Sequence, residues 1–215
     1  MNINQTLKQY FGYDSLRTGQ RELINGILAG HDVLGIMPTG AGKSLCYQLP
    51  ALMLNGITLV ISPLISLMSD QVKALNQAGV HAAYINSSLT ENQIRMALSY
   101  ASQGRYKIIY VAPERLNTPR FLDFACNADI SMLTVDEAHC ISQWGQDFRP
   151  SYLEIAGFLT RLPRRPIVSA FTADKTTQTD IIDKLNLIDA RLFKTSFDRP
   201  NLSLDVRKGF LLRKS

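Results

Sequence analysis

The sequence has little cysteine and no long apolar run. Its 215 residues include three cysteines, at positions 46, 126 and 140, and no two of them form a Cys-x-x-Cys pair. Neither a disulfide framework nor a zinc site is therefore expected. No apolar stretch reaches the roughly 20 residues that a bilayer-spanning helix needs, and the first residues lack the basic and apolar segments of a signal peptide. We therefore expect a cytoplasmic protein with no membrane partner.

The chain also lacks internal repeats and low-complexity segments. Its length and its hydrophobic content of 46% suffice for one domain with a sizeable core. The formal net charge of +5 fits a phosphate-rich partner. Many basic proteins bind no nucleic acid, so the charge alone leaves the partner open.

Short apolar runs alternate with longer stretches of helical periodicity. This alternation predicts an α/β fold in which a parallel sheet is covered by helices on both faces. Residues 6–29 are expected to be helical and to pack on the edge of that sheet. The expected strands are Val33–Met37, Ile57–Ser62, Ala82–Asn86, Lys107–Val111, Ser131–Val135 and Ile167–Phe171, and the expected helices are Leu45–Leu54, Leu64–Ala78, Glu91–Gln103 and Thr176–Leu185.

The first expected strand leads into the segment MPTGAGKS, residues 37–44, and then into a helix. This order is typical of a phosphate-binding loop. Lys43 is expected to reach the β- and γ-phosphates of ATP, and Ser44 to ligate Mg²⁺. Met37 stands where the usual pattern has its first glycine, and the alternative is a helix N-terminus with a lysine nearby by chance. The backbone N–H groups expected to surround the phosphates belong to Thr39, Gly40, Ala41 and Gly42.

A carboxylate pair follows a later expected strand, at Asp136 and Glu137. A carboxylate at a strand end can hold Mg²⁺ through water, which assigns Asp136 to the metal. Glu137 is placed to orient and deprotonate the attacking water. Taken alone, this pair could be a solvated turn. Combined with the upstream loop, it predicts a P-loop ATPase that uses ATP and Mg²⁺.

Beyond these two motifs, the chain resembles the RecQ family of superfamily 2 helicases over about residues 8–201. Asp136 to His139 is similar to the second helicase motif, and residues 140–150 are similar to the aromatic-rich loop of that family. Further similar segments are residues 11–20 (adenine recognition), 62–72 and 110–116 (DNA contacts), 169–173 (motif III) and 196–201 (the segment leading into a second motor domain).

The resemblance implies a RecA-like, ATP-dependent 3′–5′ DNA helicase that acts in DNA repair and recombination, in the bacterial cytosol or nucleoid. It also implies that His139 links the γ-phosphate site to the DNA-contacting loop. Three residues depart from the family pattern. Thr18 replaces a proline, Ala41 replaces a glycine and could restrict loop closure, and Asp174 replaces a small residue and could cap the following helix.

The adenine base is expected to be read by three residues. The Gln20 amide can pair with both a donor and an acceptor edge of adenine, which would select ATP over GTP. Tyr13 offers an aromatic face and Arg17 a planar cation. The alternative is that Tyr13 is a core aromatic residue and Arg17 a surface charge.

Single-stranded DNA is expected to contact the aromatic-rich loop. Trp144 and Phe148 lie in a segment rich in Gly, Gln, Asp and Ser, beside Arg149, which suits stacking on bases. The alternative is that both aromatic residues are buried anchors. Further DNA contacts are expected at Ser62, Ser66 and Arg115.

The expected organisation is one RecA-like motor lobe over residues 1–201, followed by a truncated, partly disordered hinge over residues 202–215. The chain contains no Gln-x-x-Gly-Arg-x-Gly-Arg pattern, so a second lobe of the full-length protein is expected to supply the transition-state arginine. The expected partners are single-stranded and partly duplex DNA. Two alternatives stay open: an RNA helicase of the same superfamily, and a nucleotide- and DNA-binding module without turnover.

Overall fold

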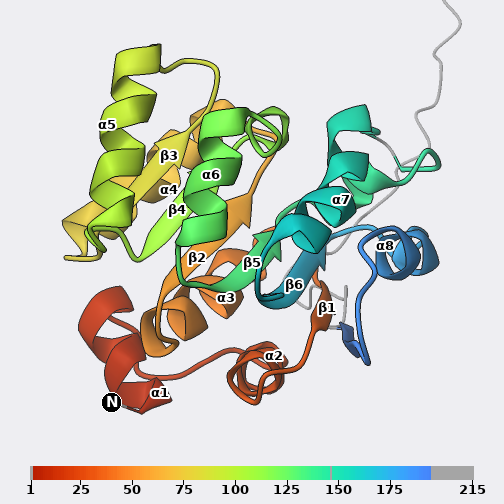
Figure 1. The fold of residues 1–215 in the computed structure, drawn as a ribbon. Helices are drawn as coiled ribbons and strands as arrows, with labels where there is room; N and C mark the ends of the chain where they lie inside the picture. Colours follow the sequence, from red (N-terminus) through yellow and green to blue (C-terminus); the bar gives the residue numbers. More distant parts are fainter. Residues whose placement is uncertain (1, 146, 195–215) are drawn as a thin grey trace, which may run out of the picture.

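The computed structural model describes residues 2–145 and 147–194. The predicted Ser196–Asn201 segment, the hinge and Gln146 of the aromatic-rich loop lie outside these residues. A seven-stranded sheet, in the order β3-β4-β2-β5-β6-β1-β7, forms the centre of the fold (Figure 1). Every strand pair is parallel. The strands are β1 Val33–Ile36, β2 Ile57–Ile61, β3 Ala82–Ile85, β4 Ile108–Val111, β5 Ile130–Val135, β6 Ile167–Thr172 and β7 Arg191–Lys194.

Helices connect these strands and begin at recognisable signals. Thr90 and Gln93 form a reciprocal capping box at the start of one helix, and Pro119 occupies the first turn of another, where its missing N–H costs nothing. The α-helices are α1 Ile3–Thr6, α2 Gln20–Leu28, α3 Lys43–Met53, α4 Ile65–Gln77, α5 Glu91–Ser102, α6 Pro119–Asn127, α7 Glu154–Arg161 and α8 Gln178–Lys184, with a π-helical turn η1 Leu7–Phe11 and 3₁₀ turns η2 Pro113–Arg115, η3 Ala138–Ile141 and η4 Pro150–Leu153.

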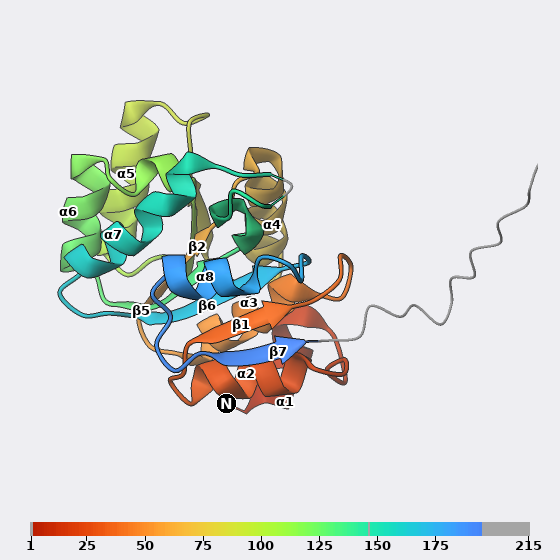
Figure 2. The ribbon, with the colours of Figure 1, turned by 90° about the vertical axis from the view of Figure 1, so that its right-hand side faces the viewer.

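Both faces of the sheet are covered (Figures 1 and 2). Helices α5, α6, α7 and α8 contribute to one apolar cluster with alternate residues of the strands. Helices α2, α3 and α4 contribute to a second cluster on the opposite face. A parallel sheet enclosed on both faces needs continuous apolar strands, and β1, β2 and β4 are buried at every position. The predicted fold class is confirmed.

The N-terminal segment differs from our prediction of one helical stretch over residues 6–29. The first helical turns end at Gly12, which has φ 73°, and residues 12–19 are not helical before α2 begins at Gln20. Glycine adopts this left-handed conformation at no steric cost, so Gly12 terminates the helix. As predicted, the segment packs at the sheet edge, where α2 contacts β1 and β7.

Other differences concern elements with weak local signals. The strand β7 and the helices α6 and α7 were not predicted. The predicted cap at Asp174 is wrong. Its carboxylate accepts hydrogen bonds of 2.8 Å from the N–H and the hydroxyl of Thr176, and α8 begins later, at Gln178.

The carboxylate of Asp32 fastens the end of the sheet that lies away from the motif residues. It accepts hydrogen bonds from the Arg165 guanidinium at 2.6 and 3.1 Å, from Val168 N–H at 2.9 Å and from Ile188 N–H at 2.8 Å. Asp32 is buried, so these charge-assisted bonds compensate the cost of removing it from water. They fix the start of β1 against β6 and the segment before β7.

Among the described residues, no helix is long and apolar enough to cross a membrane.

Candidate active site

The predicted phosphate loop lies at the carboxyl ends of the parallel strands. It follows β1, while Asp136 follows β5 and Thr172 ends the intervening strand β6. Gly40 and Gly42 have φ values of 82° and 84°, a backbone that favours glycine. A Cβ at Gly42 would lie 2.6 Å from Nε2 of Gln20, so any larger residue there would have to displace the Gln20 amide. The loop ends where α3 begins at Lys43, which directs the helix N-terminus at the site.

Two departures from the usual loop pattern are accommodated. Met37 is buried in the core beneath the loop, and its sulfur lies 3.8 Å from the sulfur of Cys46 on α3. Ala41 is not among the residues with positive φ, so its Cβ causes no backbone strain. Neither residue disturbs the turn formed by Gly40 and Gly42.

Lys43, Glu137 and His139 meet at the centre of the site. Lys43 Nζ lies 3.3 Å from Glu137 Oε1, and His139 Nδ1 lies 3.4 Å from Glu137 Oε2. The same His139 nitrogen lies 3.2 Å from the Thr172 hydroxyl. Glu137 has φ 45°, an unusual backbone for this residue type and one that is concentrated at functional sites. The structure therefore brings together the predicted lysine, glutamate and histidine.

Asp136 lies beside this group in a different environment. Its side chain is buried, and one carboxylate oxygen accepts the Glu137 N–H at 3.1 Å. Burial, reinforced by the negative charge of Glu137 and partly opposed by Lys43, raises the pKa of Asp136 to about 6. The raised pKa means that nearby positive charge does not fully balance the Asp136 carboxylate, which is therefore suited to bind a cation. Ser44 lines the same pocket and offers a hydroxyl oxygen. These oxygen donors fit Mg²⁺.

Tyr152 and Thr172 support the site but were not predicted. The Tyr152 hydroxyl donates to the Asp136 carbonyl at 3.0 Å, and Thr172 contacts His139 as described above. Tyr152 lies on η4, just beyond the aromatic-rich loop, so only the folded chain brings it to Asp136. For Thr172, the motif III resemblance was an available signal.

The predicted adenine-reading residues line the other end of the pocket. Tyr13 is 56% exposed, so the alternative of a core aromatic residue is wrong. Arg17 Nη1 donates to the Gly40 carbonyl at 2.9 Å, which ties this segment to the phosphate loop.

Gln20 is more constrained than predicted. It is only 2% exposed, and its Nε2 lies 3.2 Å from the carbonyl oxygens of both Ala41 and Gly42. Its Oε1 accepts the Arg17 N–H at 2.8 Å. Gln20 therefore braces the phosphate loop in this conformation, and pairing with adenine would require at least one of these bonds to be exchanged.

The pocket that contains these groups has a volume of about 540 Å³. Its lining joins the adenine segment, the phosphate loop and the carboxylate pair: Phe11, Tyr13, Ser15, Arg17, Gln20, Thr39, Gly40, Gly42, Lys43, Ser44, Leu45, Gln48, Leu67, Asp136 and Glu137.

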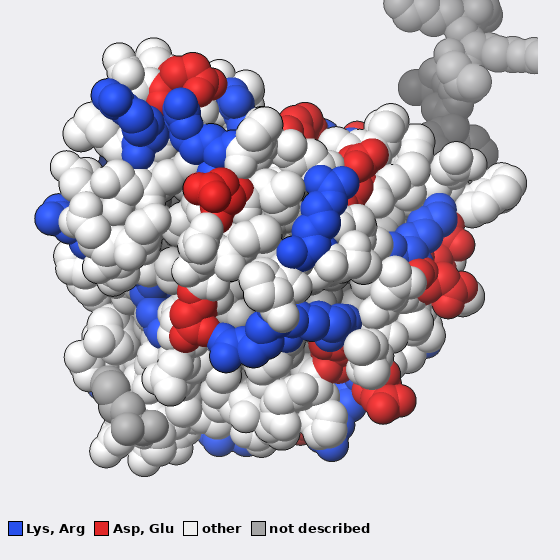
Figure 3. Space-filling view, viewed as in Figure 1, with Lys and Arg blue, Asp and Glu red and all other residues white. Residues whose placement is uncertain are grey.

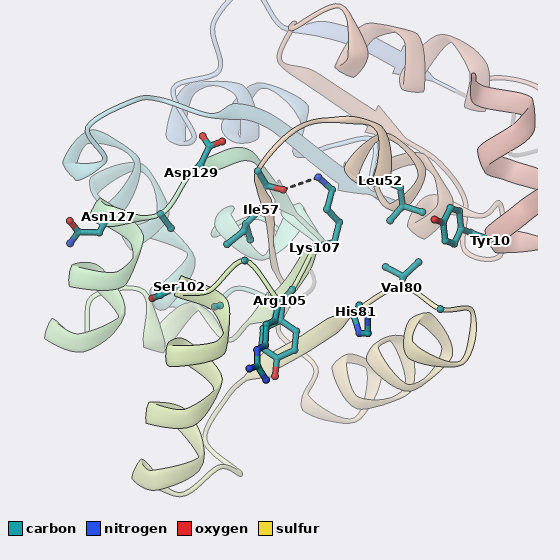
Figure 4. Close-up of a pocket in the computed structure, with 16 residues that line it drawn as sticks. Tyr10, Leu52, Ile57, Val80, His81, Ser102, Arg105, Lys107, Asn127 and Asp129 are labelled. Carbon is teal, nitrogen blue, oxygen red and sulfur yellow. Dashed lines mark hydrogen bonds between the residues drawn. The ribbon is translucent and has the colours of Figure 1, made fainter. Parts of the chain in front are cut away.

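A larger cavity, of about 670 Å³, lies at the opposite end of the strands, where β2, β3, β4 and β5 begin (Figure 4). It contains none of the motif residues. Lys107 projects along it and donates to the carbonyl oxygens of Gly56, at 2.8 Å, and Leu54. These bonds close the turn between α3 and β2. Lys107 is thus a structural residue, and the predicted active-site residues line the smaller pocket instead.

The aromatic-rich loop presents Trp144 to solvent. Trp144 is 87% exposed, so the alternative that it is a buried anchor is wrong, whereas Phe148 is half-buried. The Arg149 side chain is about one-third exposed and binds other parts of the protein. Its Nη1 donates to the Pro63 carbonyl at 3.0 Å, and its Nη2 pairs with Asp147 at 3.0 Å. This contact joins the loop to the first predicted DNA-contact segment.

The remaining predicted DNA contacts, Ser62, Ser66 and Arg115, differ in how exposed they are to solvent. Ser62 is only 1% exposed, and its buried hydroxyl has no hydrogen-bond partner among residues 2–145 and 147–194, so its prediction as a DNA contact is wrong. The side chain turns into the protein because Ser62 directly continues the buried strand β2. Ser66 is exposed, with the exposed apolar residues Leu64 and Ile65 beside it, which were not predicted. Arg115 lies 3.8 Å from Glu91.

The positive net charge is not gathered on the face that carries α5, α6 and α7. Figure 3 shows Lys and Arg interspersed with Asp and Glu on this face. One such pair joins Arg120 and Glu91 at 3.2 Å.

A glycine loop after β1, a helix that begins at Lys43 and a carboxylate pair after β5 together define a RecA-like P-loop nucleotide-binding domain. A family profile described as DEAD/DEAH box helicase matches residues 17–181. The chain belongs to the DEAD/DEAH box helicase family.

Relatives confirm the resemblance to RecQ helicases. The chain is 48% identical, over 95% of its length, to the ATP-dependent DNA helicase RecQ of Haemophilus influenzae, and 47% identical, over 94%, to that of Bacillus subtilis. It spans 33% and 35% of these two proteins. A protein of Acanthamoeba polyphaga mimivirus, provisionally named an ATP-dependent RNA helicase, is 44% identical over 95% of the chain and is covered to 38%.

Solved structures agree on the fold. The DUF1998 helicase MrfA bound to DNA superposes with a TM-score of 0.71 over 90% of this chain and 29% of its own, at 18% identity. A hypothetical ATP-dependent RNA helicase from Sulfolobus tokodaii gives 0.69 over 91% and 57%, also at 18% identity. At this identity the likeness supports the RecA-like fold alone.

Proposed function

We propose that this chain is the ATP-binding motor lobe of a DNA helicase, which binds ATP with Mg²⁺ and single-stranded DNA. One observation carries the proposal: Lys43, Ser44, Asp136 and Glu137 line a single pocket at the carboxyl edge of the sheet. Each supplies a group that phosphoryl transfer to water requires. The proposed role is to couple ATP hydrolysis to 3′–5′ unwinding in DNA repair and recombination.

The residues of the pocket divide the chemistry between them. Lys43 would leave Glu137 to contact the β- and γ-phosphates, which frees the Glu137 carboxylate to orient a water and take its proton. Ser44 and Asp136 would hold Mg²⁺, which neutralises charge on the phosphate oxygens when bound. His139 would link Glu137 to the aromatic-rich loop, because it directly precedes Cys140, the first residue of that loop.

Trp144 supports single-stranded DNA as the partner. Its ring is 87% exposed and is therefore open to stack on a base, the contact that proteins binding single strands commonly use. Ser66 and Arg115 would add polar contacts. The binding should weaken as salt concentration rises, because phosphate contacts release counterions.

A second motor lobe would complete the catalytic site. The proposed residues all lie on one side of the nucleotide, and an arginine from the facing side is worth about 10³–10⁵-fold in related phosphoryl-transfer enzymes. We therefore expect the 215-residue chain to fold and bind ATP, but to hydrolyse it slowly and to unwind no duplex. Joining the following lobe to this chain should raise ATP turnover by about that factor.

The test measures DNA-stimulated ATP turnover in the two-lobed protein. Lys43→Ala should abolish productive ATP binding, whereas Lys73→Ala, which removes an exposed lysine from α4, should leave it unchanged. Hydrolysis that survives in the Lys43 variant would refute the phosphate site.

Two alternatives predict other outcomes. ATP binding without turnover in the two-lobed protein would mean a binding module. Stronger stimulation by single-stranded RNA than by DNA of the same sequence would favour an RNA helicase, the activity given to the mimivirus relative by its name.

A further inference from the structure

A chain of hydrogen bonds connects α8 to the base of the loop that carries Trp144. The Ser142 hydroxyl donates to Asp180 Oδ2 at 2.6 Å, and the same hydroxyl oxygen accepts the Trp144 N–H at 3.2 Å. Lys184, one turn along α8, pairs with the same carboxylate oxygen at 3.3 Å. Its ammonium also donates to the Ile141 carbonyl at 3.3 Å.

These contacts hold the loop at Ser142, whereas Trp144, two residues further on, is exposed to solvent. Ser142 is fully buried, and the side chains of Asp180 and Lys184 are about one-third exposed. The Ser142 hydrogen bond, assisted by Lys184, lowers the pKa of Asp180, so the carboxylate is charged at neutral pH. A charged acceptor makes a stronger hydrogen bond than a neutral one. Trp144, only two residues from Ser142, is almost completely exposed.

The other end of η3, near His139, contacts the candidate active site. His139 contacts Thr172, the last residue of β6, while Ser142 contacts Asp180 on α8, the next helix along the chain. The turn η3 is therefore held at both ends by one continuous segment, residues 172–180.

We propose that Asp180, oriented by Lys184, is a positioning residue that fixes the Trp144 loop through Ser142 in the geometry that binds single-stranded DNA. The inference rests on the proposed function, because it assigns Trp144 to a DNA surface. Neither Asp180 nor Lys184 lines the candidate nucleotide pocket, and both lie outside the helicase-like motifs. Preorganising a side chain lowers the entropy lost when it binds a ligand.

Other contacts at the loop base are made by the backbone and would survive substitution of Asp180. Ser142 N–H donates to the His139 carbonyl at 3.0 Å, Gly145 N–H to the Ser142 carbonyl at 3.0 Å, and Arg149 N–H to the Cys140 carbonyl at 2.9 Å. Asp180→Asn should therefore leave the fold intact and change only the side-chain link. The amide has no charge with which to pair Lys184, and it is a weaker acceptor for Ser142.

The test uses Trp144, the single tryptophan of the 215-residue chain, as its reporter. Time-resolved fluorescence anisotropy without DNA measures the local motion of the indole, and titration with an oligo-dT strand measures affinity. We expect Asp180→Asn and Ser142→Ala each to increase the amplitude of local motion and to weaken binding by about 2- to 10-fold. Asp183→Asn, an exposed carboxylate on the same helix, is the matched control and should behave as wild type.

The double variant Asp180→Asn/Ser142→Ala should weaken binding no more than the stronger single variant, because both changes remove one link. Circular dichroism checks folding, and if one single variant unfolds, the other carries the test. Wild-type anisotropy in both Asp180→Asn and Ser142→Ala would overturn the inference. Failure of the wild-type chain to bind oligo-dT, with the anisotropy differences intact, would instead count against the proposed DNA surface.

Discussion

Replacing Asp136 with asparagine should make the nucleotide-free protein more stable while removing its response to Mg²⁺. Asp136 is 6% exposed, and its pKa is raised from 3.8 to about 6, first by burial and then by the charge of Glu137. A raised carboxyl pKa means that the folded state resists ionisation. The resulting loss of stability is absent below pH 3.8, develops between pH 3.8 and 6, and is complete above pH 6.

The size of the effect follows from the displacement of the pKa. Each pH unit corresponds to about 1.4 kcal/mol, so the displacement from 3.8 to about 6 costs about 3 kcal/mol of folding free energy at neutral pH. Asparagine carries no charge, and its oxygen can still accept the Glu137 N–H. Asp136→Asn should therefore raise the midpoint of thermal unfolding by about 6–12 °C at pH 7, given about 2–4 °C per kcal/mol for a domain of this size.

Thermal and urea unfolding at several pH values would measure this gain. The difference in unfolding free energy between variant and wild type should grow by about 2–3 kcal/mol between pH 4 and pH 7. Asp123→Asn, an exposed carboxylate on α6, is the control and should show no such growth. Mg²⁺ with ATP should stabilise the wild type and have little effect on Asp136→Asn. An equal or lower midpoint for Asp136→Asn at pH 7, with no dependence on pH, would refute the reasoning.

Three further substitutions test individual roles in the two-lobed protein. Glu137→Gln should preserve ATP binding but lower turnover by about 10²–10⁴-fold, because an amide cannot take a proton; a rate within a few-fold of wild type would mean that another group is the base. Gln20→Ala should weaken ATP binding by loosening the phosphate loop and should also relax the preference for ATP over GTP. Competition between the two nucleotides measures both effects, and weaker binding with unchanged selectivity would mean that Gln20 only supports the loop. Trp144→Ala should reduce DNA stimulation of the ATPase more than the basal rate, since stacking is worth about 1–3 kcal/mol per base, and an equal loss of both rates would argue against the DNA contact.

The arrangement of the candidate phosphate site could be predicted because each of its two motifs is continuous in sequence. The loop, Lys43 and Ser44 occupy consecutive positions between one strand and one helix, and Asp136 and Glu137 directly follow a buried strand. Parallel strands then bring both motifs to the same edge of the sheet. The contact between Lys43 and Glu137 spans 94 residues, yet the topology alone makes it predictable.

The missed features depend on contacts that no local pattern encodes. Strand β7 has three exposed residues out of four, so it carries no apolar run, and its pairing with β1 defines it. The sequence shows that Ser62 ends an apolar run but not whether its hydroxyl turns inward. Gln20 was predicted to face adenine, and only the folded chain shows its amide against the phosphate loop.

The strand order has a consequence for synthesis of the protein. Among the described strands, β1 pairs only with β6 and β7, which are the last two in the chain. A chain emerging from the ribosome therefore presents the phosphate loop early, but the strand that carries it has no partner until residues 167–172 have been made. Strands β2, β3, β4 and β5 can already associate by then. Closing such a long-range pairing is slow relative to local structure, so insertion of β1 should be a late step of folding. An unfinished chain would thus lack an assembled nucleotide site, and ATP would bind only after nearly the whole domain exists.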